Sequence, residues 1–558
     1  MVSQSMRWLR EIEVHTLVTA GPPTSNGDLH LGHLSGPYTA ADIHTRYLRL
    51  HRRDVRAICA ADDHQSYVAL KAAQTGRTPA EVADDYGRVI AGSLRAADIA
   101  LDLFGHPATS SRYRAFIQHV VTVLHGNGAL RTRTSEVPYC APCDRLLFEA
   151  HIKGRCRHCN AGSDGGICEA CGFPNGGADL KDARCAACNT PTSATRPATR
   201  LVFPLNEHKD YLRGTVAAAD MNAHARALCN ALLASDLPDV AVTQPADWGI
   251  AVPLRHYEDQ RISAWFELGP HYLALTDLLH EAGGGPDWRS VWTGPDVVQC
   301  FGFDSAYFHI VLFPALFRAF DPAIRPPCGF IVNEFYRLDG AKFSTSRKHA
   351  LWASDFLQSE SSDAARFHLC ATRPEIEQTN FTLADYRDTL SRELIGVWDG
   401  WLRGLAARSA TTAPATAHWT PDHLRFHARL AAVTAAIARC YEVADFSTQR
   451  ATRLLGDLVR DAAAFGAGNA FHAGQAARQG EYRTGLALEL AAARALALAS
   501  YPIMPRFGAA LWADLGLGAI AEARWSTTPQ LLAEGAPLAL RAAGYFTPHS
   551  HDGKVLAA

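Results

Sequence analysis

Four CxxC pairs lie close together in one short stretch of the chain and restrict what that stretch can form. They are Cys140/Cys143, Cys156/Cys159, Cys168/Cys171 and Cys185/Cys188. Two CxxC turns supply four thiolates in the tetrahedral arrangement that Zn²⁺ prefers. Eight such cysteines therefore predict two four-cysteine zinc sites, and four filled coordination positions predict a structural role. A disulfide framework is the alternative, which a reducing cytoplasm disfavours. The spacing leaves open which pairs share an ion.

An α/β pattern surrounds this stretch, which we place at about residues 131–198. Before it, HTLVTA (15–20) and RAICA (56–60) are predicted strands, with an amphipathic run from Leu34 to Leu50 between them. We expect the Gly36-Pro37 pair to lie in the first turn of that helix. After it, the predicted strands are Ser263–Phe266, Val297–Phe301 and Phe330–Asn333. From about Leu383 helical periodicity dominates, most clearly over Leu454–Phe465 and Thr484–Ser500.

Composition narrows the functional classes. The 558 residues are 48% hydrophobic and 20% charged, with a formal net charge of −2. No apolar stretch reaches the roughly 18 residues that a membrane span needs. The N-terminus lacks the basic-then-apolar pattern of a signal peptide, so we expect a cytoplasmic protein. A net charge near zero argues against a protein that coats nucleic acid.

Two segments carry the residue types of phosphate chemistry. HLGH (30–33) follows a predicted strand and a turn and begins a predicted helix. Backbone N–H groups at a helix N-terminus and two imidazoles suit phosphate oxygens, and Gly32 permits a close approach to the backbone. LDGAKFSTS (338–346) offers a glycine-hinged loop with a lysine and hydroxyls, which suits a departing pyrophosphate.

In this order, the two segments resemble the two signatures of class I aminoacyl-tRNA synthetases, most closely those of methionyl-tRNA synthetases. Supporting stretches are TAGPPTSNGDLHLGH, ICAADDH, the CxxC insertion, ISAW, GFDSAYFH, GAKFSTSR and YPIMP. The resemblance covers most of the chain. It implies an α/β fold in which a Rossmann-type parallel sheet is split by a zinc-binding insertion and followed by an all-α helical bundle. The implied domains are 1–130 and 246–325 (the two Rossmann halves), 131–245 (the connective insertion), 326–385 (the stem-contact region) and 386–558 (the anticodon-binding-like helical domain).

The resemblance also implies site residues and cofactors. The catalytic residues would be His30, His33 and Lys342. The ATP-binding residues would be Asn26, Gly32, Gly302, Asp304, Ser344 and Ser346. The amino-acid-binding residues would be Pro22, Thr24, Asp62, Trp265, Leu268, Tyr272 and His309. Core packing is the alternative for the aromatic residues, and a helix N-cap is the alternative for Asp62. ATP with Mg²⁺ and two structural Zn²⁺ ions are the expected cofactors.

Several positions depart from the family pattern around the amino acid. Pro22 and Thr24 stand where the family has leucine and tyrosine, and Leu268 and Gly269 stand where it has alanine and proline. A hydrophobic pocket discriminates by about 1–3 kcal/mol per methylene, so these changes are large enough to alter the preferred amino acid. The bulk of Leu268 favours a substrate smaller than methionine.

Further departures concern phosphate and anticodon recognition. Thr345 replaces the second signature lysine, which predicts slower adenylation or a compensating role for Arg347. The glycine–lysine–aspartate of the family reads Gly302-Phe303-Asp304. In the helical region, Gly400 and Gly404 align with anticodon-reading residues, and no tryptophan lies near residues 469–474.

Three functional hypotheses remain. The first is a ligase that activates an amino acid other than methionine and passes it to a small-molecule amine or hydroxyl acceptor. The second is a methionine–tRNA ligase with a divergent pocket, whose acceptor is tRNA. The third is a non-catalytic tRNA-binding paralogue, which the intact His30, His33, Asp62 and Lys342 count against. We expect a monomer or a homodimer.

Overall fold

The computed structural model describes residues 16–294, 296–343 and 349–548, and this part of the chain divides into two compact units. The first holds the described residues of Met1–Leu29, together with Val55–Leu94 and Ala100–Glu334. The second holds His30–Asp54, Arg95–Ile99 and the described residues of Phe335–Ala558. The HLGH segment therefore groups with the C-terminal part of the chain. Ser344 and Ser346, with Thr345 and Arg347, lie outside the described residues.

A parallel five-stranded sheet in the order β14-β13-β1-β2-β3 forms the centre of the first unit. Its strands are β1 (Thr16–Ala20), β2 (Val55–Ala60), β3 (Leu103–Gly105), β13 (Asp296–Gly302) and β14 (Gly329–Asn333). Four of the predicted strands are thus confirmed, and they are β1, β2, β13 and β14. All five residues of β1 are buried, as expected for the middle strand of a sheet that is covered on both faces.

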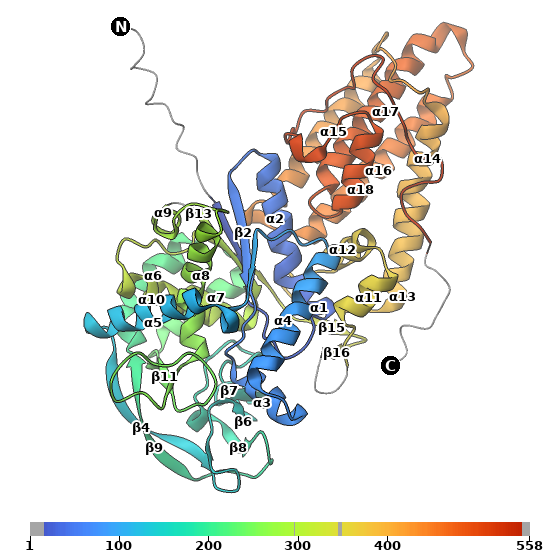
Figure 1. Ribbon diagram of the computed structural model, residues 1–558. Coiled ribbons are helices and arrows are strands. Elements are labelled where there is room, and N and C mark those ends of the chain that lie inside the picture. Colours follow the sequence, from blue (N-terminus) through green and yellow to red (C-terminus); the bar gives the residue numbers. More distant parts are fainter. Residues whose placement is uncertain (1–15, 295, 344–348, 549–558) are drawn as a thin grey trace, which may run out of the picture. The chain divides into compact units, whose positions relative to one another are not determined.

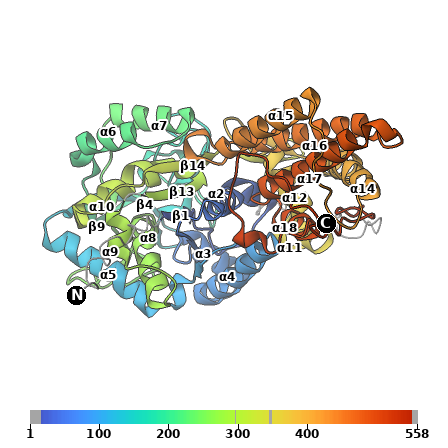
Figure 2. The ribbon, with the colours of Figure 1, turned by 90° about the horizontal axis from the view of Figure 1, so that it is seen from above.

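Helices cover this sheet on two sides. Figure 2 shows α6 and α7 on one side of β1 and β13, and α5, α8 and α9 on the other. The helices of this unit are α3 (Ser66–Thr75), α4 (Pro79–Ala96, whose last two residues belong to the second unit), α5 (Ser111–Gly126), α6 (Lys209–Ala218), α7 (Ala223–Ala234), α8 (Ala264–Glu281), α9 (Trp288–Thr293) and α10 (Phe313–Phe320).

One predicted strand, Ser263–Phe266, is wrong. The strand there, β12, covers only Arg261–Ile262, and Ser263 is the N-cap of helix α8. The stretch ISAW is rich in β-forming residues, but only Ile262 belongs to β12, and Ala264 and Trp265 lie in the first turn of a helix that is buried on nearly all sides. Tertiary burial outweighs local propensity here.

The cysteine-rich insertion forms small antiparallel sheets within the first unit. Strands β4 and β9 pair over eight residues and form the long ribbon at the bottom of Figure 1. Strands β7, β6 and β8 form a second sheet. The strands of this region are β4 (Arg131–Cys140), β5 (Arg145–Leu146), β6 (Glu149–Arg155), β7 (Gly162–Gly165), β8 (Lys181–Cys185), β9 (Thr195–Phe203), β10 (Val240–Ala241), β11 (Thr243–Gln244) and β12.

The second unit begins with a bent helix. Helix α1 (Leu31–His33) continues through a π-helical segment, Leu34–Tyr38, into α2 (Thr39–Leu50). Gly36 has φ −82° and ψ −115° and therefore breaks the helix just before Pro37. The Gly36-Pro37 pair thus lies at a bend inside the helical run, not in its first turn, because the helix already begins at Leu31.

The remainder of the second unit is mostly helical. Helices α15, α16 and α17 run side by side in Figure 1 and confirm the helical periodicity predicted for this region. Its elements are β15 (Tyr336–Leu338), β16 (Ala341–Lys342), β17 (Thr379–Phe381), α11 (Ala353–Ser359), α12 (Ser362–Ala371), α13 (Leu383–Asp388), α14 (Asp399–Arg408), α15 (Pro421–Arg439), α16 (Thr448–Ala470), α17 (Gln479–Ser500) and α18 (Pro505–Asp514). Within the described residues, no helix is both long and apolar enough to cross a membrane.

Candidate active site

The two histidines of HLGH cap the helix that they begin. His30 is the N-cap of α1, and its Nδ1 accepts a hydrogen bond from the backbone N–H of His33 at 3.3 Å. In return, the Nδ1 of His33 accepts the backbone N–H of His30 at 3.2 Å. The two rings stack at 3.6 Å between centroids. This is a capping box built from two imidazoles, and it satisfies two backbone donors at the helix start.

The capping box fixes the tautomer of both rings. Because each Nδ1 accepts a hydrogen bond, a neutral ring carries its proton on Nε2. Burial lowers the pKa of His30 well below its usual value, and the charges of His33 and Lys342 lower it further. His30 is therefore neutral at pH 7 and presents Nε2–H as a donor, which is the chemistry that a phosphate oxygen requires.

Gly32 allows this stacking. A Cβ at Gly32 would lie 3.0 Å from the ring of His30 and 3.2 Å from the ring of Phe343. The Phe343 ring stacks on His30 at 4.5 Å. The residue after Lys342 thus packs on the HLGH turn, within the second unit.

Lys342 lies on β16 and pairs in register with Arg337 of β15. The residue is exposed, and its Nζ lies 5.4 Å from the centroid of Phe335. Its charge is close enough to lower the pKa of His30. All three residues predicted to be catalytic, His30, His33 and Lys342, are therefore close together in the second unit.

In the first unit, Tyr272 and His309 form a buried pair. The Tyr272 hydroxyl lies 2.8 Å from Nε2 of His309, and Nδ1 of His309 lies 3.0 Å from the carbonyl oxygen of Ser305. A carbonyl only accepts, so Nδ1 carries the proton. Burial lowers the pKa of His309 to about 4, so the ring is neutral and the Tyr272 hydroxyl donates to Nε2.

Trp265 stacks on Phe308 with a centroid distance of 4.4 Å and an interplanar angle of 2°. Its Nε1 is buried and has no hydrogen-bond partner among the described residues. Leu268 is buried in the hydrophobic core of the first unit. A Cβ at Gly269 would meet Phe313 at 3.0 Å, so this glycine faces helix α10.

Asp62 is tied to the loop that holds Pro22 and Thr24. Thr24 and Asp62 form a parallel β-bridge, and the Asp62 N–H donates to the Pro23 carbonyl at 2.8 Å. The N-cap of α3 is Gln65, so Asp62 does not cap that helix. Burial raises the pKa of Asp62 well above its usual value, and the charges of Glu267, Asp63 and Glu149 raise it further. An amino acid ammonium group would relieve this repulsion.

A buried polar network lies beside Asp62 and was not predicted from the sequence. His64 Nδ1 lies 2.8 Å from Oε1 of Glu267, and the Tyr113 hydroxyl donates to the same oxygen at 2.9 Å. Burial lowers the pKa of His64, but the Glu267 and Asp63 carboxylates together raise it overall. Glu267 lies one helical turn from Ser263 and two residues after Trp265. An acidic residue among the apolar residues at the start of α8 was the sequence signal that could have indicated this network.

Gly302 and Asp304 lie at the C-terminal end of β13. A Cβ at Gly302 would lie 2.7 Å from Oδ1 of Asp304, so the glycine makes room for this carboxylate. Burial raises the pKa of Asp304 to about 6. Asn26 lies in the turn after β1, where its backbone N–H donates to the Thr24 carbonyl at 2.9 Å.

The cysteines group into two nested sets. One is Cys140, Cys143, Cys185 and Cys188, and the other is Cys156, Cys159, Cys168 and Cys171. Sγ–Sγ distances are 3.5 and 3.9 Å in the first set and 3.8 and 3.5 Å in the second. A tetrahedral site with Zn–S bonds of about 2.3 Å needs about 3.8 Å between sulfurs. Both sets fit zinc, which would cross-link strands of the insertion and supply no reaction chemistry.

Comparisons with a family profile and with curated proteins agree with each other. The profile of the family "tRNA synthetases class I (M)" matches residues 16–405. The methionine–tRNA ligase of Pyrococcus furiosus is 31% identical over 69% of this chain and 55% of its own length. That of Porphyromonas gingivalis is 33% identical over 69% of this chain and 57% of its own length. The matched region thus spans little more than half the length of these curated relatives.

A solved structure supports the fold over nearly the whole chain. The Mycobacterium tuberculosis methionyl-tRNA synthetase in complex with methionyl-adenylate superposes with a TM-score of 0.78. The superposition covers 94% of this chain and 98% of the M. tuberculosis chain, at 19% sequence identity.

Proposed function

Because the chain belongs to the family of class I (M) tRNA synthetases, we propose that it activates an amino acid with ATP. The products of this step are an aminoacyl-adenylate and pyrophosphate. The ATP would enter with Mg²⁺. HLGH and Lys342 would act on the phosphates, and Asp62 and Asp304 would hold the amino acid and the ribose.

The observation that carries this proposal is the capping box of His30 and His33. Its hydrogen bonds leave both rings with Nε2–H donors at the start of a helix. Donors held in place before the reaction stabilise charge that develops on the phosphates in the transition state. Lys342, whose charge reaches His30, would add positive charge where pyrophosphate departs.

The first unit supplies the features of an amino acid site. Asp62 would pair with the α-ammonium group, because its buried carboxylate lies among other acidic groups. The buried Tyr272–His309 pair and the Trp265 ring would contact the side chain. Asp304 would accept the ribose hydroxyls, and Asn26 and Gly32 would also contact ATP.

We further propose that the amino acid is not methionine and that the acceptor is a small molecule. Pro22, Thr24 and Leu268 stand at positions that the resemblance assigns to the amino acid pocket, where it implies other residues. The second candidate is a methionine–tRNA ligase, which the names of the relatives favour. In that case tRNA would be the acceptor.

ATP–pyrophosphate exchange with each standard amino acid and simple non-standard ones tests both proposals. Exchange needs no acceptor, so it reports activation alone. Exchange with an amino acid other than methionine is the expected result. Methionine as the sole strong substrate would overturn the change of substrate and support the second candidate. Absence of exchange with every amino acid would overturn the activation proposal and leave a non-catalytic paralogue.

A further inference from the structure

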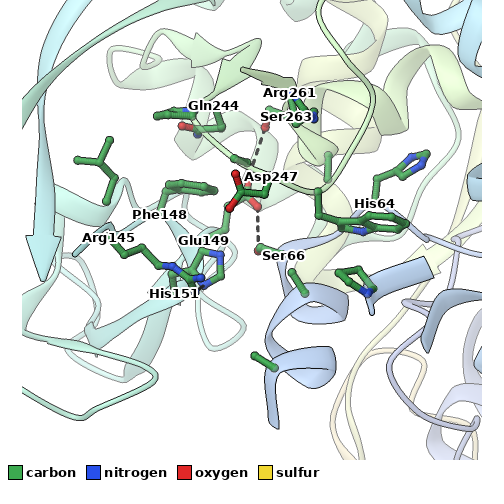
Figure 3. Close-up of a pocket in the computed structure, with 18 of the residues that line it drawn as sticks. His64, Ser66, Arg145, Phe148, Glu149, His151, Gln244, Asp247, Arg261 and Ser263 are labelled. Atoms are coloured by element: carbon green, nitrogen blue, oxygen red, sulfur yellow. Dashed lines mark hydrogen bonds between the residues drawn. The ribbon is translucent and has the colours of Figure 1, made fainter. Parts of the chain in front are cut away.

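A cavity of about 720 Å³ lies in the first unit, beside the amino-acid-binding residues. The start of α3, the insertion strand β6 and the loops around residues 244–248 and 259–264 line it. Ser263 and Ala264 belong to its wall and directly precede Trp265. His64, which pairs with Glu267, belongs to the wall too. Figure 3 shows the side chains that converge on this space.

Glu149 is a buried carboxylate in this wall. Its side chain accepts hydrogen bonds from the Ser66 hydroxyl at 2.9 Å and from the Ser263 hydroxyl at 3.3 Å, both drawn as dashed lines in Figure 3. Ser66 Oγ also accepts the N–H of Ala150 at 3.2 Å, so its one proton is available for Glu149. Among the described residues, Glu149 forms no ion pair. A buried carboxylate with only hydroxyl partners suits a cationic ligand.

The backbone of Glu149 indicates that this position is held against strain. Its φ is +47°, a left-handed conformation that is unfavourable for glutamate. The pairing of β6 with β7 shifts register between Glu149 and Lys153, as in a β-bulge. A Cβ at Gly165, across this bulge, would lie 2.8 Å from the backbone N of Glu149. Bulges re-aim side chains and strained residues concentrate at functional sites.

The surroundings of Glu149 suit an amine. Phe148 and Trp248 line the same cavity, and aromatic faces attract ammonium groups. Arg145 and Arg261 also line it and form no ion pair with a described carboxylate. An amine that carries a carboxylate would therefore meet a complementary charge at both ends. Glu149 also lies near enough to Asp62 for its charge to raise the pKa of that residue.

We propose that this cavity binds the acyl acceptor, and that the acceptor is a small primary amine of the amino acid class whose nitrogen is held by Glu149. This inference rests on the proposed function. The amine nitrogen attacks the carbonyl carbon of the aminoacyl-adenylate and forms a C–N bond. The bond between that carbon and the phosphate oxygen breaks, and AMP leaves with the electron pair. The ammonium group bound by Glu149 gives one proton to this carboxylate before the attack, which frees the lone pair of the nitrogen. The nitrogen loses a second proton to solvent as the amide forms.

The test combines two assays on the same preparations of the full-length protein. ATP–pyrophosphate exchange measures activation, and release of AMP in the presence of a panel of amino acids as amines measures transfer. An amide product identified by mass spectrometry defines the acceptor. We expect at least one amine to accelerate AMP release.

Glu149→Gln keeps the shape of the side chain and removes its charge. We expect amine-dependent AMP release, divided by the exchange rate of the same variant, to fall at least about tenfold, as for loss of a charged hydrogen bond. Glu136→Gln is the matched control, because Glu136 is an exposed glutamate of β4 whose carboxylate also accepts a hydroxyl, from Thr195, and it is not among the residues that line the cavity. It should leave this ratio unchanged. Ala69→Phe, which fills the cavity from α3, should lower the ratio as well and serves if Glu149→Gln fails to fold.

The outcomes separate the two proposals. Exchange without acceleration by any amine, or acceleration by tRNA alone, would overturn the acceptor site and leave activation intact. A normal ratio in both Glu149→Gln and Ala69→Phe would show that the amine binds elsewhere. Absence of exchange in the wild type would overturn the proposed function and, with it, this inference.

Discussion

The hydrogen bonds of His30 allow its two roles to be separated by substitution. Its Nδ1 caps helix α1, and its Nε2–H is the donor that we assign to a phosphate oxygen. Asparagine places an oxygen near the position of Nδ1 and is a good N-cap, but it has no group at the position of Nε2. Glutamine places an N–H donor near Nε2 but has no acceptor at the position of Nδ1. His30→Asn therefore removes the phosphate donor and His30→Gln removes the cap.

The expected magnitudes differ between the two variants. Loss of a donor held ready for transition-state charge costs about 10²–10³ in rate, or about 2.7–4 kcal/mol. Loss of an N-cap costs about 0.5–2 kcal/mol of stability. His30→Asn should thus lower kcat/KM for ATP in the exchange assay by about 10²–10³ with little change in Tm. His30→Gln should retain more exchange and unfold at a lower temperature.

Exchange kinetics and thermal unfolding of both variants test the two roles assigned to His30. Near-wild-type exchange by His30→Asn would refute the assignment of Nε2–H to a phosphate. A reversed order, with His30→Gln the less active and the more stable variant, would refute the tautomer argument.

Four other predictions follow from the described contacts. Lys342→Ala should reduce exchange by at least about tenfold with little effect on stability, because the side chain is exposed and its charge acts on the transition state; unchanged exchange would contradict this role. Elemental analysis should find two zinc ions per chain, and one or none would contradict the two nested sets. The pKa of Asp304 is raised to about 6, so the carboxylate protonates as the pH falls through that value; KM for ATP should rise below pH 6, and this rise should be absent in Asp304→Asn. Arg366→Met should lower the free energy of unfolding by about 3 kcal/mol, because it leaves the buried Asp42, 2.6 Å away, with one fewer cation; Arg392→Met, at an exposed ion pair, is the control in denaturant unfolding.

Four of the five strands of the parallel sheet could be predicted, because they are short apolar runs that end at turns, whereas the three-residue β3 was missed. β1, β2, β13 and β14 coincide with HTLVTA, RAICA and two later runs almost residue for residue. The start of α8 could not be predicted, because Ser263–Phe266 has the composition of a strand and becomes helical through burial. The bend at Gly36 was missed because the helical run continues on both sides of it.

Sequence motifs identified some of the candidate site residues, but not the residues and contacts that depend on the three-dimensional fold. HLGH marks His30 and His33, but their reciprocal hydrogen bonds depend on backbone geometry. CxxC spacing gave the eight cysteines, and only the fold decides that the outer pairs and the inner pairs each form a set. Glu149 belongs to no motif. Its burial depends on a bulge in β6 and on contacts with α3 and Ser263, which the sequence does not reveal.

Direct detection of the adenylate tests the central claim most closely. The purified protein would be incubated with ATP, Mg²⁺ and an equimolar mixture of amino acids, and the protein-bound nucleotides analysed by mass spectrometry. We predict an aminoacyl-adenylate whose mass identifies an amino acid other than methionine. Methionyl-adenylate would contradict the pocket argument. ATP or AMP without any adenylate would contradict the claim that this chain activates an amino acid.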